Sequence, residues 1–118
     1  MKRTISNQIG AVFVPVRDIE RARDWYSAIL DLPIEGDIQF GHLYCIPMES
    51  GTQLVLDSKI YREESRRETP LFHFNTDDID AAYADLKEKD VTILTDIEHG
   101  HWFTFQDPDG NVLMVCKC

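Results

Sequence analysis

Two side chains in this sequence could act together as a general base. His73 lies inside the strand-like run PLFHFNT, and Asp57 ends the run ESGTQLVLD. If both side chains face one cavity, the Asp57 carboxylate would orient the imidazole of His73 so that it can accept a proton from a bound compound. A histidine that only hydrogen-bonds a neighbour or contacts a ligand is the alternative explanation, so catalysis does not follow from the pair alone.

Other histidines and cysteines stand at spacings that metal sites use. His99 and His101 are two residues apart, and so are Cys116 and Cys118, so each pair would project from one face of a strand. Imidazole and thiolate groups bind zinc-like ions. An exposed loop is the plainer explanation for the histidines, and reduced structural thiols are the plainer one for the cysteines. We therefore predict no metal site at either pair.

Two similar halves of the chain must position these side chains. The residues at 18–22, DIERA, recur 60 positions later as DIDAA at 78–82. A strand-like apolar run precedes each copy, and a helix with one apolar stripe follows it. Asp18 and Asp78 are predicted N-caps, because aspartate accepts hydrogen bonds from the unpaired amides of a first helical turn. Each half then ends in a glycine-containing turn and a strand, so we expect an α+β fold of two βαβββ modules.

We place the modules at residues 1–57 and 70–118 of a single domain, with a connector at 58–69. A chain of 118 residues is long enough to bury a core without metal or disulfides. The connector includes Arg62–Glu68, where basic and acidic residues lie together. That composition is typical of a solvated linker, and contact with a second subunit is the alternative. Each module would carry its helix on one face of its sheet, which leaves the other faces to enclose a cleft.

The turn DPDGN at Asp107–Asn111 predicts how its two flanking strands pair. Pro108 presets φ for the first corner, and Gly110 takes the left-handed position that completes a three-residue hairpin loop. With that loop length, Thr104 lies opposite Met114. A loop one residue longer or shorter would turn every side chain to the other face.

Alternation along the strands then sorts side chains onto two faces. The same construction in the first module sets Cys45 opposite Val55. One face is uniformly apolar and is predicted to pack on the helices. The other mixes apolar, aromatic and polar groups, which is the composition of a small-molecule pocket. The predicted ligand-contacting residues are Phe13, Cys45, Gln53, Val55, Leu71, His73, Asn75, Trp102, Thr104, Met114 and Cys116.

Two motifs together resemble the vicinal oxygen chelate superfamily, which includes glyoxalase I, bleomycin-resistance proteins, fosfomycin-resistance enzymes and extradiol dioxygenases. They are VRDIERARDWYS at Val16–Ser27 and DPDGN at Asp107–Asn111, and the resemblance spans Ile9–Val115. It implies two βαβββ modules that form an open, U-shaped mixed sheet around a small-molecule site. It also implies a homodimer.

The resemblance also assigns the positions at which metal-dependent members carry their ligands. These correspond here to Ala11, Val55, Leu71 and Met114. All four side chains are apolar, whereas divalent ions need oxygen or imidazole donors. We therefore predict no metal and no cofactor, and we interpret Met114 as a flexible apolar pocket residue. A soft metal bound by methionine is the alternative.

These observations favour a protein that binds a small organic molecule in its cleft without metal, as the bleomycin-resistance members do. The alternative is an enzyme of the same superfamily, a lyase, isomerase or hydrolase, that uses His73 with Asp57 and lacks the standard metal site.

Charge and hydropathy exclude several other classes of function. The net charge is −9 and no basic stripe is present, so we expect no nucleic-acid partner. The negative charge favours a cationic ligand instead. No run approaches the roughly 18 apolar residues of a spanning helix, so we expect no membrane partner. The first residues lack the pattern of a signal peptide, which predicts a cytoplasmic location.

Overall fold

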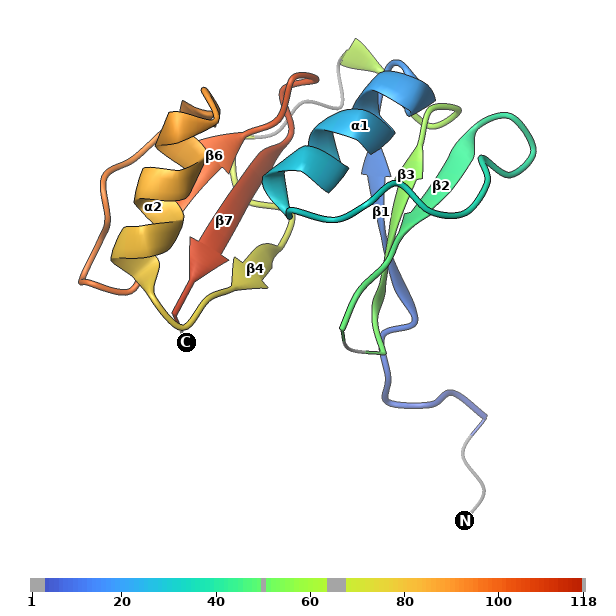
Figure 1. The fold of residues 1–118 in the computed structure, drawn as a ribbon. Helices are drawn as coiled ribbons and strands as arrows, with labels where there is room; N and C mark the ends of the chain where they lie inside the picture. The colour runs from blue at the N-terminus through green and yellow to red at the C-terminus, as the bar shows by residue number, and fades with distance from the viewer. Residues whose placement is uncertain (1–3, 50, 64–67, 118) are drawn as a thin grey trace. The chain divides into compact units, whose positions relative to one another are not determined.

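The protein is described by a computed structural model that covers residues 4–49, 51–63 and 68–117 (Figure 1). The chain divides into two compact units, Met1–Ile60 and Tyr61–Cys118, and each contains one helix and one open sheet. The α+β class predicted from the sequence is confirmed. Residues 64–67 of the predicted connector at 58–69 lie outside the described residues.

The first unit is built from β1 (Ala11–Pro15), α1 (Ile19–Ile29), β2 (Leu43–Ile46) and β3 (Gln53–Asp57). The strand order is β1-β3-β2, in which β1 runs parallel to β3 and β2 runs antiparallel to it. The central strand β3 therefore holds both edge strands in register. Its alternating side chains decide what each face of this sheet presents.

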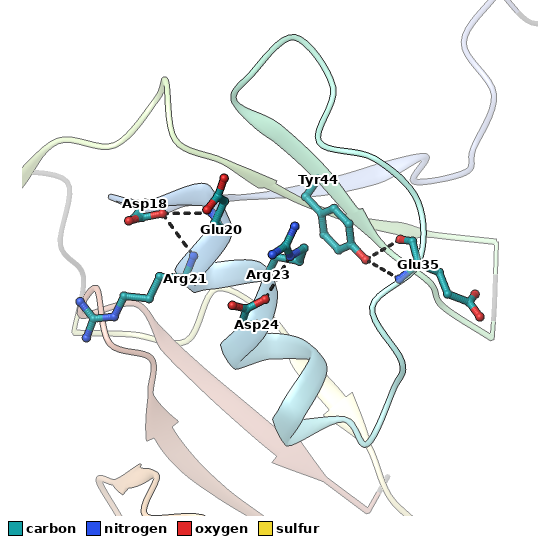
Figure 2. A network of polar contacts seen from close by, with 7 residues as sticks. All are labelled: Asp18, Glu20, Arg21, Arg23, Asp24, Glu35 and Tyr44. Carbon is teal, nitrogen blue, oxygen red and sulfur yellow. Dashed lines mark hydrogen bonds and ion pairs between the residues drawn. The ribbon is translucent and has the colours of Figure 1, made fainter.

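A further strand was expected between α1 and β2, and the structure reduces it to the isolated bridge between Gln39 and Leu43. Pro33 and Gly36 interrupt this segment, and both residue types weaken a strand. The loop is held instead by the buried Tyr44, whose hydroxyl donates to the Glu35 carbonyl oxygen at 2.6 Å and accepts from the Glu35 amide at 3.3 Å (Figure 2).

The second unit has the predicted βαβββ order in full. It contains β4 (His73–Asn75), α2 (Ile79–Glu88), β5 (Thr92–Ile93), β6 (Trp102–Gln106) and β7 (Val112–Cys116). The strand order is β4-β7-β6-β5, with β4 parallel to β7 and the other pairs antiparallel. In Figure 1, α2 lies beside β6 and β7 in this unit.

Both helices begin at the predicted caps. The Asp18 carboxylate accepts from the amides of Glu20 at 3.0 Å and Arg21 at 3.2 Å (Figure 2), and Asp78 accepts from the amide of Ala81 at 3.0 Å. Each bond satisfies a first-turn amide that has no partner within its helix. The repeat in the sequence therefore marks two equivalent helix starts.

The side chains of each sheet separate into the two predicted faces. In the first unit, the row Val14, Leu56 and Tyr44 is almost completely buried. In the second unit, Phe103 packs against Tyr83 of α2, with ring centroids 5.1 Å apart, and Phe105 is fully buried. We call the opposite face of each sheet, which carries no helix of its own unit, the uncovered face.

The predicted hairpin register is confirmed. Thr104 pairs with Met114 and Cys45 pairs with Val55. In the DPDGN turn, the Gly110 amide donates to the Asp107 carbonyl oxygen at 3.1 Å, and Gly110 has a φ of 86°. Glycine adopts this left-handed conformation without the penalty that a Cβ would bring.

None of the described helices combines the length and apolar character that crossing a membrane requires.

Candidate functional site

Met114 lies at the centre of the uncovered face of the second unit. It pairs with Thr104 on β6 and with His73 on β4, so these three side chains form one row across three strands. Thr104 and Met114 are half-buried, while His73 is exposed and has no hydrogen bond among the described residues. The row offers a flexible apolar centre with one hydroxyl and one imidazole beside it.

Trp102 extends this face in the next row. Its indole Nε1 donates to Glu98 Oε2 at 2.8 Å, which holds the ring in one orientation. The His99 ring lies 5.2 Å from it, and both His99 and His101 are exposed in a tight turn. The exposed-loop explanation for the two histidines is therefore confirmed. The half-buried indole leaves an aromatic surface beside the Met114 row.

Other predicted residues of the second unit lie in the same rows. Asn75 is exposed and pairs in register with Cys116. Cys116 is only 2% exposed and is held in a disulfide, so the expectation of a reduced thiol is wrong there. Cys118 lies outside the described residues. Leu71 is half-buried, and its amide donates to the Val112 carbonyl oxygen at 2.9 Å.

Val55 lies at the centre of the uncovered face of the first unit. It pairs with Cys45 on β2 and with Phe13 on β1. Phe13 is 54% exposed, which is unusual for so large an apolar side chain on a sheet. Gln53 is exposed in the preceding row, and Cys45 is a free, exposed cysteine whose Sγ lies 4.0 Å from Gln53 Oε1. Val55 itself is only 5% exposed, so this row presents Phe13 and Cys45 on either side of a buried apolar centre.

The Asp57 carboxylate has a different partner from the one considered in the sequence analysis. Asp57 is 6% exposed and accepts from the Nδ1 of His42 at 3.0 Å and from the Lys59 amide at 2.9 Å. His73 belongs to the other unit. Within the first unit, the imidazole that pairs with Asp57 is therefore that of His42.

Sequence reasoning paired Asp57 with His73 and did not consider His42 as its partner. The register places Leu43 opposite Asp57, so the residue before Leu43 lies at the same end of the sheet. A signal was present: the dipeptide Gly-His occurs at 41–42 and again at 100–101, with the 59-residue offset that relates Gly51 to Gly110.

None of the predicted ligand-contacting residues lines a hollow of about 450 Å³ in the second unit, although Thr95 of its lining accepts a hydrogen bond from the Thr104 hydroxyl at 3.2 Å. It is lined by Tyr83 and Lys87 of α2, by Val91, and by residues 93–96. Tyr83 donates to Asp96 Oδ1 at 3.4 Å across it. The hollow is wide open and lies on the helix side of its unit, so we assign the candidate site to the uncovered faces instead.

Comparisons with known proteins agree with this architecture. The sequence profile of the Glyoxalase/Bleomycin resistance protein/Dioxygenase superfamily matches residues 8–115. The chain belongs to this superfamily. No curated protein sequence matches the chain.

Solved structures of the glyoxalase/bleomycin-resistance superfamily resemble the chain over nearly its full length. TnmS3, an antibiotic-binding protein from Streptomyces sp. CB03234, is 28% identical over 98% of both chains, with a TM-score of 0.74. A glyoxalase/bleomycin resistance protein from the same strain is 27% identical, with a TM-score of 0.71, and the match covers 93% of this chain and 100% of that one. A superfamily member from Sphaerobacter thermophilus DSM 20745 is 24% identical, with a TM-score of 0.71 and coverage of 96% and 98%, and supports the fold alone.

The residues at the superfamily's metal-ligand positions do not fit a divalent ion. In the first unit these positions hold Ala11 and Val55, and in the second they hold Leu71 and Met114. Hydrocarbon side chains have no lone pair to donate, and a single thioether is a poor ligand for hard or borderline ions. Within residues 4–49, 51–63 and 68–117, no three His, Cys, Asp or Glu side chains are grouped so that they could hold a metal ion.

Proposed function

We propose that this protein binds a small organic molecule on its uncovered sheet faces without a resident metal ion. The observation that carries the proposal is the composition of the two central rows. Val55 stands between Cys45 and Phe13, and Met114 stands between Thr104 and His73. An apolar centre with a few polar groups at its edge is what small-molecule sites present.

Aromatic residues on these faces indicate the kind of ligand. Phe13 in the first unit and the indole of Trp102 in the second each offer a flat apolar surface, and Met114, in the row next to Trp102, can adapt its shape to a guest. The similarity to TnmS3, which is an antibiotic-binding protein, supports a compound of this type. We therefore expect an aromatic natural product or antibiotic as the ligand.

The proposal is tested by thermal-shift screening against a panel of aromatic antibiotics. A compound that binds the folded protein raises the melting temperature in proportion to its concentration and affinity. We expect Trp102→Ala to weaken the binding affinity for such a compound by about tenfold or more. Truncating a central aromatic contact typically costs ~1.4 kcal/mol or more of binding free energy. Trp25→Phe, in α1 and outside the uncovered faces, is the matched control and should leave the affinity unchanged.

Metal analysis of the purified protein can contradict the metal-free proposal. If a divalent ion were present at one equivalent per chain, and its removal abolished ligand binding, the metal-free proposal would be wrong. Equal loss of affinity in Trp102→Ala and Trp25→Phe would instead show that the uncovered face of the second unit is not the site.

We further propose that the protein works as a homodimer. The superfamily resemblance supports the dimer, and so does the apolar side chain of Ile9 just before β1, which is 71% exposed. Sedimentation equilibrium would measure the dimer directly. Ile9→Asp should shift the protein toward monomer if this surface is the interface, and a monomeric wild-type protein would contradict the proposal.

A further inference from the structure

His42, which pairs with Asp57 at the end of β3, follows a tight turn, and an equivalent turn occurs in the second unit. In the first unit, the His42 amide donates to the Gln39 carbonyl oxygen at 3.1 Å, and the central residues Phe40 and Gly41 have φ values of 54° and 75°. Two consecutive positive φ angles in a hairpin define a type I′ turn. His42 is therefore placed at the start of β2 by a tight, well-defined turn.

Asp57 fixes which nitrogen of the His42 ring carries the proton. An ionised carboxylate can only accept hydrogen bonds, so the His42 Nδ1 that lies 3.0 Å from Asp57 Oδ1 must be the donor. In the neutral imidazole the lone pair then resides on Nε2. The Lys59 amide, which donates to the same carboxylate oxygen at 2.9 Å, holds Asp57 in place.

The His42 side chain is not needed to close this end of the sheet. The Ser58 amide already donates to the His42 carbonyl oxygen at 3.0 Å, and the Leu43 amide donates to the Gln39 carbonyl oxygen at 3.0 Å. The His42 ring is 27% exposed, and its Nε2 has no hydrogen-bond partner among the described residues. This nitrogen is therefore an oriented acceptor that none of the described side chains uses.

Phe40 provides an aromatic surface beside this acceptor. Its side chain is 84% exposed, and its ring lies 6.5 Å from the His42 ring at an angle of 35°. A bulky residue with positive φ is a backbone outlier, and such outliers cluster at functional sites. Neither burial nor backbone preference accounts for a phenylalanine at this position, whereas stacking on a flat ligand would.

The second unit contains the equivalent imidazole with a weaker partner. His101 follows the turn residues His99 and Gly100, whose φ values are 52° and 69°. Its Nδ1 lies 3.1 Å from the Lys117 carbonyl oxygen, so the same tautomer is favoured there. Hydrogen bonds to an ionised acceptor are stronger than those to a neutral one, so Asp57 polarises the His42 ring more than Lys117 polarises that of His101.

We propose that His42 Nε2 is the hydrogen-bond acceptor that selects ligands carrying an aromatic hydroxyl group, with Phe40 stacking on the ring that bears it. Asp57 acts as a positioning residue, because it reaches the ligand only through the imidazole. The inference rests on the proposed function and adds to it the ligand's chemical class, a phenol, and the side chain that recognises it.

The tautomer is tested without any ligand. Long-range nitrogen–proton correlation spectra of the labelled protein should show the proton of His42 on Nδ1 and a bare Nε2. Asp57→Asn should weaken this preference, because the amide can donate as well as accept, while the signals of His101 stay unchanged. A wild-type spectrum with the proton on Nε2 would overturn the inference.

The selection is tested with 4-methylphenol, which stays protonated at neutral pH, and its methyl ether, 4-methylanisole, by equilibrium dialysis. We expect the wild-type protein to bind the phenol roughly three- to tenfold more tightly, the range that one net hydrogen bond supplies. His42→Asn keeps an amide donor toward Asp57 but lacks an acceptor at the Nε2 position, so the two compounds should then bind alike. His101→Asn, at the equivalent imidazole of the second unit, is the matched control and should keep the preference.

The outcomes separate this inference from the proposed function. Equal binding of the two compounds to the wild-type protein, or a preference that survives in His42→Asn, overturns the role of His42 and leaves the proposed function standing. If the protein binds antibiotics in the thermal-shift screen but binds neither of these two compounds, the role of His42 is wrong and the proposed function still stands. If no compound in either experiment binds, both are wrong.

Discussion

The carboxylate of Asp107 should be the most costly side chain of the DPDGN turn to remove. Asp107 is 4% exposed. Its Oδ1 accepts from the amides of Asp109 at 2.9 Å and Asn111 at 2.8 Å, and its Oδ2 accepts from the Asn111 side-chain amide at 2.7 Å. Asp107→Ala therefore leaves two buried backbone donors and one side-chain donor without this partner.

The expected loss follows from those two backbone donors. A buried donor left unsatisfied costs about 1–3 kcal/mol, so two of them lower the free energy of unfolding by about 2–4 kcal/mol, allowing for partial rescue by water. Asp107→Asn keeps one acceptor oxygen for both amides and should cost only about 1 kcal/mol. The exposed Asp37 has no hydrogen bond among the described residues, and Asp37→Ala should stay within about 0.5 kcal/mol.

Urea unfolding, followed by tryptophan fluorescence and circular dichroism, measures these differences. At about 4 °C per kcal/mol, Asp107→Ala should also lower the melting temperature by roughly 8–16 °C. The slope of the unfolding free energy against urea should not change, because the folded state exposes no new surface. A loss below about 1 kcal/mol for Asp107→Ala would refute the view that this carboxylate holds the turn and the β6–β7 register.

Two further predictions concern the helix caps and the strained turn. Asp18→Ala and Asp78→Ala should each lower the free energy of unfolding by about 1 kcal/mol, because each removes an acceptor for first-turn amides. Urea unfolding measures both losses. A negligible loss in either variant would contradict the prediction. Phe40→Gly should leave stability unchanged or raise it by up to ~1 kcal/mol, since glycine relieves the penalty of positive φ and the exposed ring contributes little to the core. A melting temperature several degrees below that of the wild type would show that the Phe40 ring packs on the protein instead.

Much of the fold could be predicted because its determinants are local. The cap residues Asp18 and Asp78 act within one helical turn, and the DPDGN turn sets the pairing of the strands beside it. Once that pairing is known, alternation alone decides which face each side chain occupies. For this reason the pairing of Thr104 with Met114, and the face on which both side chains lie, could be derived from the sequence.

The candidate site could be predicted only in part. Its rows follow from register, but the pairing of His42 with Asp57 joins a turn residue to the end of a strand fifteen positions away. Alternation does not apply inside a turn. The repeated Gly-His dipeptide marks two equivalent turns, but it does not point the His42 ring toward that carboxylate, since His101 contacts the Lys117 carbonyl oxygen instead. The expected strand before β2 failed for a related reason, because a tertiary contact from Tyr44 holds Glu35 in a loop.

The sequence by itself determined the repeat, the helix starts, the hairpin register and the apolar character of the superfamily's metal positions. These depend on neighbouring residues and on short-range backbone geometry. Only the tertiary structure decided which imidazole Asp57 binds and which nitrogen is left bare. Side chains that are distant in sequence meet according to how loops close and strands pack, and a hydrogen bond depends on a few tenths of an ångström that no residue pattern encodes.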